Sequence, residues 1–294
     1  MTNLEGKVAA ITGAASGFGR ELARLGARHR MRLALADVQR DALDAVVKEL
    51  KRAGAVVISD VVDVAQASQV QRFAEHAFSS FGQVNLLINN AGVGGGGYVW
   101  ENTARDWQWV IGVNLMGVVH GVQHFIPRML QANQNGEPAH IVNTASVAGW
   151  LAAPLMGVYN VSKHAVIALS ETLHHDLRLA QSTIGVSVLC PAFVPTGIAQ
   201  SSRFRPAELL NAEELTASQT VAQAASEKAV ASGKITAEEV AQQTFDAVRD
   251  NRFYVFTHPQ ILPSLRARFD AVLGGAEPAD PYAARVGARP AMPT

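Results

Sequence analysis

Short, nearly unbroken apolar runs alternate with longer amphipathic stretches along most of the chain. Apolar runs without polar alternation are typical of strands that are buried on both faces of a parallel sheet. The stretches between them carry apolar residues at helical spacing. We expect about seven strands, at residues 8–12, 33–37, 56–62, 86–90, 140–146, 186–190 and 253–257. We expect helices at residues 17–29, 40–53, 68–81, 103–131, 159–181 and 236–250, the last with a capping box at its start.

This alternation predicts right-handed crossovers and a doubly wound, Rossmann-like α/β fold, with residues 1–294 forming one dinucleotide-binding and catalytic domain. Residues 196–235 are polar and Ala-rich, with no strand pattern. That segment is too long for a plain loop, so we predict a helical substrate lid; an arm that contacts another subunit is the alternative. Residues 259–294, rich in Pro, Ala and Arg, are expected to form a C-terminal tail.

The composition excludes several classes of protein. Lys plus Arg and Asp plus Glu both number 25, so a neutral chain is not drawn to nucleic acid or to an anionic membrane. No apolar run approaches the roughly 20 residues of a membrane helix, and residues 1–7 do not resemble a signal peptide. Cys190 is the single cysteine, so no internal disulfide can form; we expect a cytoplasmic protein with Cys190 in its core.

A glycine-rich turn follows the first expected strand, with the sequence Thr-Gly-Ala-Ala-Ser-Gly-Phe-Gly at residues 12–19. Gly13 permits a sharp turn, Gly17 lets the backbone approach a phosphate, and Gly19 lets the helix pack closely. The N–H groups that open the helix, near Ser16 and Phe18, can bind a pyrophosphate. The turn therefore predicts a dinucleotide site, although a tight strand-to-helix turn would use the same residues.

Asp37 ends the second strand, where a carboxylate can accept both hydroxyls of the adenosine ribose. It would also repel a 2′-phosphate, and neither Ser16 nor Val38 is basic, so we predict NAD in preference to NADP. Capping of the next helix is the alternative role of Asp37. Asp63, followed by Val64, either bonds the adenine amino group or caps a helix. The small residues Asn90, Ala91 and Gly92 let the chain pass beneath the cofactor.

Tyr159 and Lys163 are spaced i, i+4, which places them on one face of a helix about 6 Å apart. A phenol with a pKa near 10 is a weak base at pH 7, but an adjacent ammonium and a positive nicotinamide ring favour the phenolate. Lowering that pKa by about two or three units takes roughly 3–4 kcal/mol. Ser146 can hold the substrate oxygen. The set predicts hydride transfer between NAD(H) and a secondary alcohol or ketone; a surface pair is the alternative.

Together these motifs resemble the compact short-chain dehydrogenase/reductases over about residues 5–260. The resemblance implies that Asn114 bends a long helix and holds a water that connects Lys163 to solvent, and that Lys163 bonds the nicotinamide ribose. It implies that the segment from Pro191 to Thr196 meets the carboxamide, with Val194 and Thr196 in contact. Ala192 replaces the usual Gly and Phe18 the usual Ile. It also implies a homodimer or homotetramer.

Residues 111–115, 125–129, 198–206 and 250–259 further resemble bacterial aryl-alcohol Cα-dehydrogenases, which oxidise benzylic secondary alcohols of lignin-derived dimers with NAD. This implies a bulky or aryl substrate. The alternatives are a non-catalytic dinucleotide sensor and an NADP-dependent ketone reductase. A sugar-nucleotide epimerase or dehydratase would need a larger C-terminal domain.

Some features point to no clear chemistry. The pairs His120/His124 and His174/His175 have no third ligand, so we expect no metal site. Residues 94–97, all Gly, give either a bare edge with room for a large substrate or a simple loop. Three tryptophans, Trp100, Trp107 and Trp109, either line a cleft or pack between helices.

Overall fold

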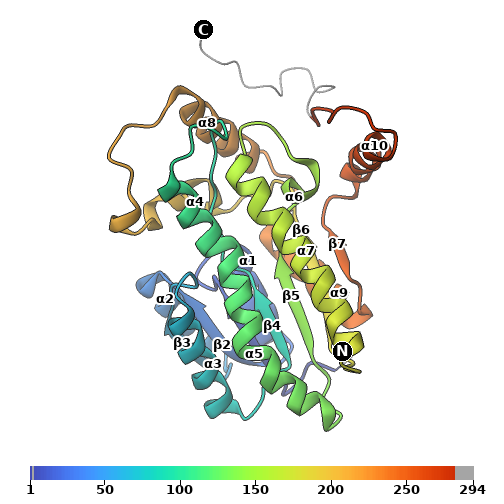
Figure 1. Ribbon diagram of the computed structural model, residues 1–294. Helices are drawn as coiled ribbons and strands as arrows, with labels where there is room; N and C mark the ends of the chain where they lie inside the picture. Colours follow the sequence, from blue (N-terminus) through green and yellow to red (C-terminus); the bar gives the residue numbers. More distant parts are fainter. Residues whose placement is uncertain (2, 282–294) are drawn as a thin grey trace.

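Seven parallel strands form the centre of the protein in a computed structural model that describes residues 1 and 3–281 (Figure 1). The strands are β1 (Val8–Thr12), β2 (Arg32–Asp37), β3 (Val57–Val61), β4 (Leu86–Asn89), β5 (His140–Thr144), β6 (Gly185–Cys190) and β7 (Tyr254–Phe256). Their order in the sheet is β3-β2-β1-β4-β5-β6-β7. The predicted doubly wound sheet is therefore confirmed, with its change of direction between β1 and β4.

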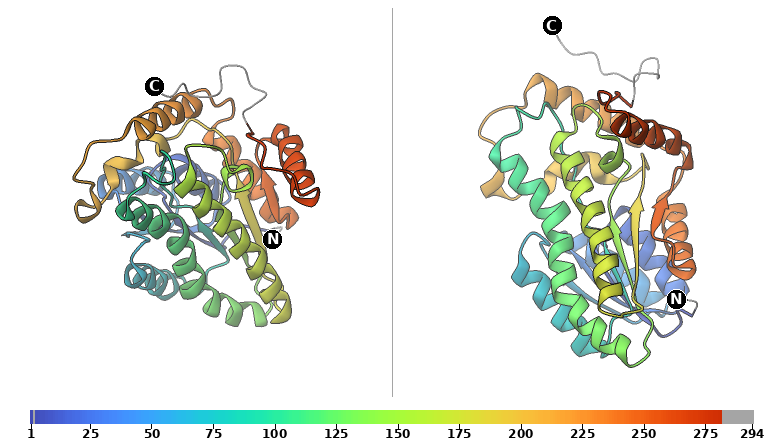
Figure 2. Two further views of the ribbon diagram at one scale, coloured as in Figure 1. Left: turned by 45° about the horizontal axis from the view of Figure 1, so that its top comes forward. Right: turned by 45° about the vertical axis from the view of Figure 1, so that its right-hand side comes forward.

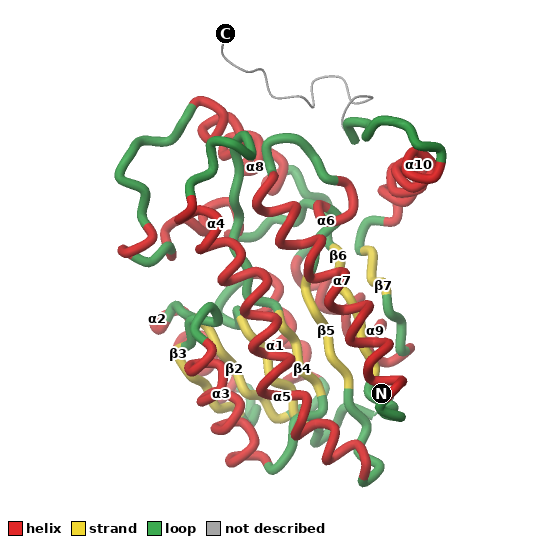
Figure 3. Tube along the Cα trace, in the orientation of Figure 1, coloured by secondary structure: helices red, strands yellow, loops and turns green. Residues whose placement is uncertain are grey.

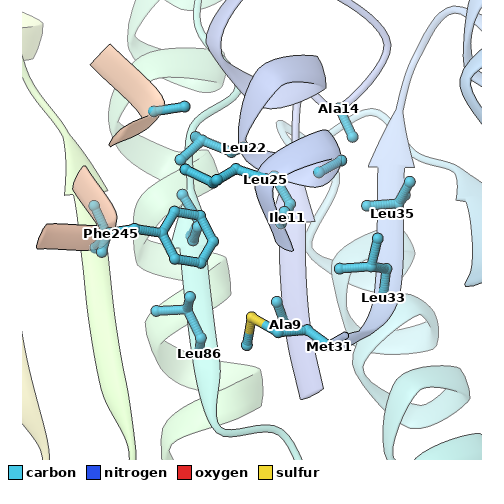
Figure 4. Packing of buried hydrophobic residues seen from close by; sticks show 14 of the residues in the cluster. Ala9, Ile11, Ala14, Leu22, Leu25, Met31, Leu33, Leu35, Leu86 and Phe245 are labelled. Carbon is cyan, nitrogen blue, oxygen red and sulfur yellow. The ribbon is translucent and has the colours of Figure 1, made fainter. Parts of the chain in front are cut away.

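Helices cover both faces of the sheet (Figure 3). One face carries α1 (Gly17–Arg28), α2 (Arg40–Arg52) and α9 (Ala237–Asp250), and the other carries α3 (Ala67–Phe81), α5 (Gly117–Gln134) and α7 (Gly157–Leu179). Figure 4 shows the first face, where Leu22, Leu25 and Phe245 pack against strand residues that include Ile11 and Leu86. Because the central strands are covered on both sides, most of their side chains are apolar in both directions.

The predicted helix at 103–131 is continuous in space but not regular. It consists of α4 (Ala104–Ile111), the π-helical turn η1 (Gly112–Met116) and α5. Asn114 lies in the π turn, as the predicted bend requires, and π turns of this kind often occur at functional sites. The run Ala104–Gln134 does meet the length and hydropathy criteria for a membrane span, contrary to our expectation, with a mean hydropathy of 1.3. Half of that window is buried, as in the core helix of a globular domain.

Residues 196–235 contain no strand and include η2 (Gly197–Phe204), η3 (Ala207–Leu209) and α8 (Ala217–Ala231). Figures 1 and 2 show this segment beyond one end of the sheet. The expected tail begins instead with η4 (Pro259–Ile261) and the helix α10 (Leu262–Leu273). That helix is held by Arg268, which donates to the carbonyl of Trp150, and by Phe269, whose ring lies 6.1 Å from the Trp150 ring. Residues 282–294 of the expected tail lie outside the described residues.

His140 makes the stability of the fold depend on pH. Its ring is buried at the start of β5, with Nε2 2.8 Å from Ser187 Oγ, and burial lowers its pKa to about 3. Between pH 6.5 and 3 the unfolded chain binds a proton that the folded chain does not, so stability is lost as the pH falls. We expect His140→Gln to remove roughly 1 kcal/mol per pH unit from the pH dependence of unfolding below pH 6.

Urea unfolding at pH 7, 6 and 5 measures this slope. The exposed His175 provides the matched control, because His175→Gln should leave the slope unchanged. Parallel pH profiles for His140→Gln and the unmodified protein would show that His140 does not control acid stability.

Candidate active site

A cavity of about 1150 Å³ opens at the carboxyl ends of the strands, where the strand order changes direction between the paired strands β1 and β4. Crevices at this position are the usual ligand sites of doubly wound sheets. Every predicted site residue lines the cavity except Gly19 and Asn114. The lining residues are Gly13, Ser16, Gly17, Phe18, Asp37, Asp63, Val64, Asn90, Ala91, Gly92, Ser146, Tyr159, Lys163, Pro191, Val194 and Thr196.

The glycine turn has the shape that the sequence predicts. Gly13 and Gly17 have φ angles of 66° and 50°, in the region that favours glycine. A Cβ on Gly19 would lie 2.0 Å from the Gly13 carbonyl oxygen, so α1 can begin this close to β1 only with glycine there. Ser16 is the N-cap residue of α1, but its side chain makes no capping hydrogen bond. The opening N–H groups of α1 are thus not satisfied by that side chain, which suits a bound phosphate.

Asp37 is buried at the edge of the cavity. One carboxylate oxygen accepts from the backbone N–H of Ala15 and the other from that of Gln39, both at 2.9 Å. Burial raises the pKa of this carboxyl group, and the backbone hydrogen bonds oppose the rise. A carboxylate has about four acceptor positions, so each oxygen retains capacity for a further donor. Asp37 therefore ties the glycine turn to the end of β2 and still presents acceptors to the cavity.

Asp63 does not cap α3, whose N-cap residue is Gln66, but closes a turn just before that helix. Its Oδ1 accepts from the backbone N–H of Ala65 at 3.0 Å. The carbonyl of the next residue, Val64, lies 2.9 Å from Nδ1 of His120, which joins this loop to α5. Both residues line the cavity, and the contact of Asp63 with the adenine amino group stays a prediction.

Tyr159 and Lys163 project from α7 into the inner part of the cavity. Lys163 Nζ lies 5.7 Å from the centre of the Tyr159 ring and donates to the Thr144 carbonyl at 2.9 Å. Burial lowers the pKa of Lys163 to about 8 and raises that of Tyr159 to about 12, while the Ser146 hydroxyl opposes the latter shift. The protein alone therefore does not produce the expected fall in the phenol pKa, because desolvation of the phenolate outweighs its neighbours.

Ser146 lies two residues after β5, since the strand ends at Thr144 rather than at residue 146. Its hydroxyl donates to the Pro191 carbonyl at 3.3 Å and accepts from the backbone N–H of Ala148 at 3.1 Å. These contacts hold the hydroxyl between the end of β5 and the segment after β6. Ser146 and Tyr159 both line the cavity, and a hydrogen bond from the Ser146 hydroxyl would lower the pKa of Tyr159.

The Asn114 side chain is fully buried and does not line the cavity. Its amide accepts from the Val93 N–H at 2.8 Å and donates to the Val93 carbonyl at 3.0 Å. It also donates to Ser162 Oγ at 3.0 Å, and Ser162 donates to the Tyr159 carbonyl at 2.7 Å. Asn114 thus fixes the loop after β4 against the first turns of α7. The water-holding role implied for Asn114 stays a prediction.

Two site features were not predicted. The Thr12 hydroxyl accepts from the backbone N–H groups of Asn90 and Ala91 at 2.9 and 3.1 Å, which joins the glycine turn to the loop after β4. The Thr144 carbonyl, as noted, holds the ammonium group of Lys163. The first contact joins the ends of the neighbouring strands β1 and β4, and the second joins the end of β5 to α7. Both depend on tertiary structure, so no local sequence pattern predicts them.

The glycines at 94–97 are neither a bare edge nor a plain loop, because residues 197–231 pack on them. The Gly94 N–H donates to Ser201 Oγ at 2.8 Å. A Cβ on Gly96 would lie 2.7 Å from Ala222 Cβ, and one on Gly97 would lie 2.6 Å from Gln219 Cγ. The tract is therefore the surface on which η2 and α8 rest, and side chains there would push these helices away.

A second contact joins the same segment to α4. Arg205 forms an ion pair with Asp106 at 2.6 Å, and its guanidinium lies 5.3 Å from the centre of the Trp109 ring. Trp109 is buried and lines the cavity, so it fits both predicted roles of the tryptophans. Trp100 fits neither, since it is 78% exposed and stacks on Tyr98.

The remaining candidates are structural. Cys190 is buried, accepts from Trp150 Nε1 at 3.4 Å, and has a pKa raised to about 12 by burial, as expected of a core thiol. Within residues 1 and 3–281, no group of three or more His, Cys, Asp or Glu side chains is arranged to hold a metal ion.

Comparison with known proteins agrees with this geometry. The family model described as short chain dehydrogenase matches residues 7–206. A "CLA biosynthesis dehydrogenase/reductase" of Lactiplantibacillus plantarum is 34% identical, over 95% of this chain and 97% of its own. A "C alpha-dehydrogenase" of a Sphingobium strain is 33% identical, over 97% of this chain and 92% of its own.

Among solved structures, a short chain dehydrogenase/reductase from Burkholderia phymatum in complex with NAD is 54% identical. It covers 95% of this chain and 99% of its own, with a TM-score of 0.93. The matched family model covers the glycine turn, the π turn and the Tyr159/Lys163 pair. This chain is therefore a member of the short-chain dehydrogenase/reductase family of oxidoreductases.

Proposed function

We propose that this protein transfers a hydride between NAD(H) and a secondary alcohol or ketone, with Tyr159 as the proton donor or acceptor. The observation that carries the proposal is the convergence of Tyr159, Lys163 and Ser146 on one cavity that also contains the glycine turn and Asp37. The glycine turn fits the cofactor, because the φ angles of Gly13 and Gly17 turn the chain sharply into α1, whose opening N–H groups can donate to a diphosphate. When bound, the nicotinamide supplies the hydride donor or acceptor and a positively charged ring.

The residues of the chain then have distinct tasks. Ser146 holds the substrate oxygen, and Tyr159 takes its proton during oxidation or returns it during reduction. Lys163, fixed by Thr144, orients the nicotinamide ribose and adds positive charge beside the phenol. Asn114 keeps the loop after β4 against α7, and water in the π turn passes protons between Lys163 and solvent. A dinucleotide sensor would not need this complete set.

Asp37 and the Burkholderia relative support NAD as the cofactor. The Asp37 carboxylate lies at the cavity edge where the adenosine ribose is expected, and no basic residue stands at position 16 or 38. The relative from Burkholderia phymatum is described with NAD bound. Both observations favour a free 2′-hydroxyl over a 2′-phosphate.

The outer cavity suits a bulky apolar substrate. The wall formed by α4, the loop before α7 and residues 197–231 carries polar side chains and a set of large apolar ones, which are Trp109, Val110, Leu155, Met156, Phe204, Leu209 and Leu215. The Sphingobium relative, a Cα-dehydrogenase, supports an aryl alcohol of this kind. Turnover of a panel of aryl and alkyl secondary alcohols with NAD tests the proposal. Equal inactivity toward all of them, with cofactor bound, would contradict it.

We further propose that residues 196–235 act as a substrate lid that rests on the glycines at 94–97. Gly96→Ala places a Cβ 2.7 Å from Ala222 Cβ, so α8 must move away. We expect the KM for a bulky substrate to rise about five- to tenfold, since roughly 1 kcal/mol of lid docking is lost. Hydrogen exchange in residues 217–231 should become faster.

The double variant Gly96→Ala with Ala222→Gly relieves the contact and should restore KM. In the unmodified protein, exchange across 196–215 should slow when NADH and a substrate analogue are added. A segment that is strongly protected beforehand and unchanged by ligand would instead be a structural arm, the alternative raised by its sequence.

A further inference from the structure

The diphosphate end of the cavity lacks a cation in its glycine turn. Residues 12–19 contain no charged side chain. The start of α1 supplies a partial charge of only about +0.5, whereas a dinucleotide diphosphate carries two negative charges. A cationic side chain from elsewhere in the fold would therefore strengthen cofactor binding considerably.

Arg203, in η2, reaches this end of the cavity. Its Nη2 lies 3.2 Å from the position that a Cβ on Gly197 would occupy. Gly197 follows Thr196, whose Cγ2 lies 3.4 Å from the corresponding position on Gly17. Arg203, Gly197, Thr196 and Gly17 all line the cavity. The Arg203 guanidinium therefore lies beside Gly197, in the same segment whose Thr196 lies beside Gly17 at the start of α1.

Arg203 differs from two other cations that line the cavity, because no acceptor within residues 1 and 3–281 contacts its guanidinium. Arg205 is paired with Asp106, and Lys163 donates to Thr144. Within the described part of the chain, Arg203 forms no ion pair, and its guanidinium lies 4.5 Å from the centre of the Phe204 ring. Stacking of this kind leaves the in-plane N–H donors available for a bidentate contact with a phosphate.

We propose that Arg203 binds the diphosphate of the nicotinamide dinucleotide from the lid side, opposite the start of α1. This inference rests on the proposed function, because it assigns a residue to the same cofactor. The contact would also link the two binding steps, since a bound diphosphate holds η2 in place before the substrate arrives. The lid would then close in response to cofactor and not to substrate alone.

Binding of NADH and of ADP-ribose, measured by calorimetry, tests this without turnover. A charge-assisted contact that is partly exposed corresponds to about a tenfold change in Kd, so Arg203→Gln should weaken both ligands by about that factor. Arg203→Lys should lie between, and adenosine, which has no phosphate, should bind equally to all three proteins. Higher salt should narrow the difference for NADH. Lys228→Gln, which removes another cation of the cavity lining, is the matched control and should leave Kd unchanged.

Other outcomes overturn the inference. Unchanged Kd values of Arg203→Gln for NADH and ADP-ribose would show that Arg203 does not contact the cofactor. A rise in the substrate KM alone would show that Arg203 contacts the substrate instead. A loss confined to NADPH would place it at the 2′-phosphate. Faster hydrogen exchange of residues 197–204 in ligand-free Arg203→Gln would show that the substitution loosens the lid, so that the change in Kd is not a lost contact with the diphosphate. Failure of the unmodified protein to bind NADH would refute the proposed function itself.

Discussion

Tyr159→Phe should lose nearly all turnover, by about 10²–10⁴-fold in kcat, and still bind NADH with a Kd close to that of the unmodified protein. The substitution removes the hydroxyl that exchanges a proton with the substrate and leaves the ring in place. Lys163 keeps its hydrogen bond to the Thr144 carbonyl, so its contribution to cofactor binding remains. Stopped-flow measurement of hydride transfer, together with NADH titration, separates the two effects.

Tyr254→Phe is the matched control for this experiment. Tyr254 also has a pKa raised to about 12, but its hydroxyl donates to Glu171 at 2.7 Å and it does not line the cavity. That variant should retain full kcat. If Tyr159→Phe kept more than a tenth of the kcat, another group would have to supply the proton.

Replacing Asp37 and Val38 together should reverse the cofactor preference. In the unmodified protein, a 2′-phosphate would meet the Asp37 carboxylate in a partly desolvated site, and we expect kcat/KM to favour NAD over NADP by about 10²-fold or more. Asp37→Ala with Val38→Arg removes the repulsion and adds a cation. Val38 is 48% exposed, so the new arginine can reach solvent or phosphate without disturbing the core.

The single variant Val38→Arg separates attraction from repulsion. With Asp37 still present, it should improve NADP much less than the double variant does. The double variant also loses the hydrogen bonds that Ala15 and Gln39 donate to Asp37. We therefore expect it to bind NAD more weakly than the unmodified protein does. Comparable kcat/KM values for NAD and NADP in the unmodified protein would contradict the assigned role of Asp37.

Local patterns in the sequence determined the strands, most helices and the identity of the principal site residues. Unbroken apolar runs predicted strands covered on both faces, and the structure places seven of them in one parallel sheet. The i, i+4 spacing of Tyr159 and Lys163 predicted their separation, because helix geometry is fixed by hydrogen bonds between near neighbours. The helix that begins after Thr236 was also predicted from its capping box, whose two hydrogen bonds both form.

The tertiary structure decided what depends on contacts between distant segments. The glycines at 94–97 look like a flexible edge until α8 and η2, more than 100 residues later, are seen to rest on them. The helix α10 was missed because none of its residues is buried; contacts with Trp150 fix it, and its own apolar pattern is weak.

The pKa of Tyr159 likewise depends on burial that no spacing reveals. The sequence shows a cation one helical turn away, but desolvation acts through every group that surrounds the phenol. Neighbours along a helix are set by the local backbone, so their chemistry can be predicted from the sequence. Packing between elements and the removal of water are set by the whole fold, and these decide how Tyr159, the glycine tract and Arg203 are placed to act.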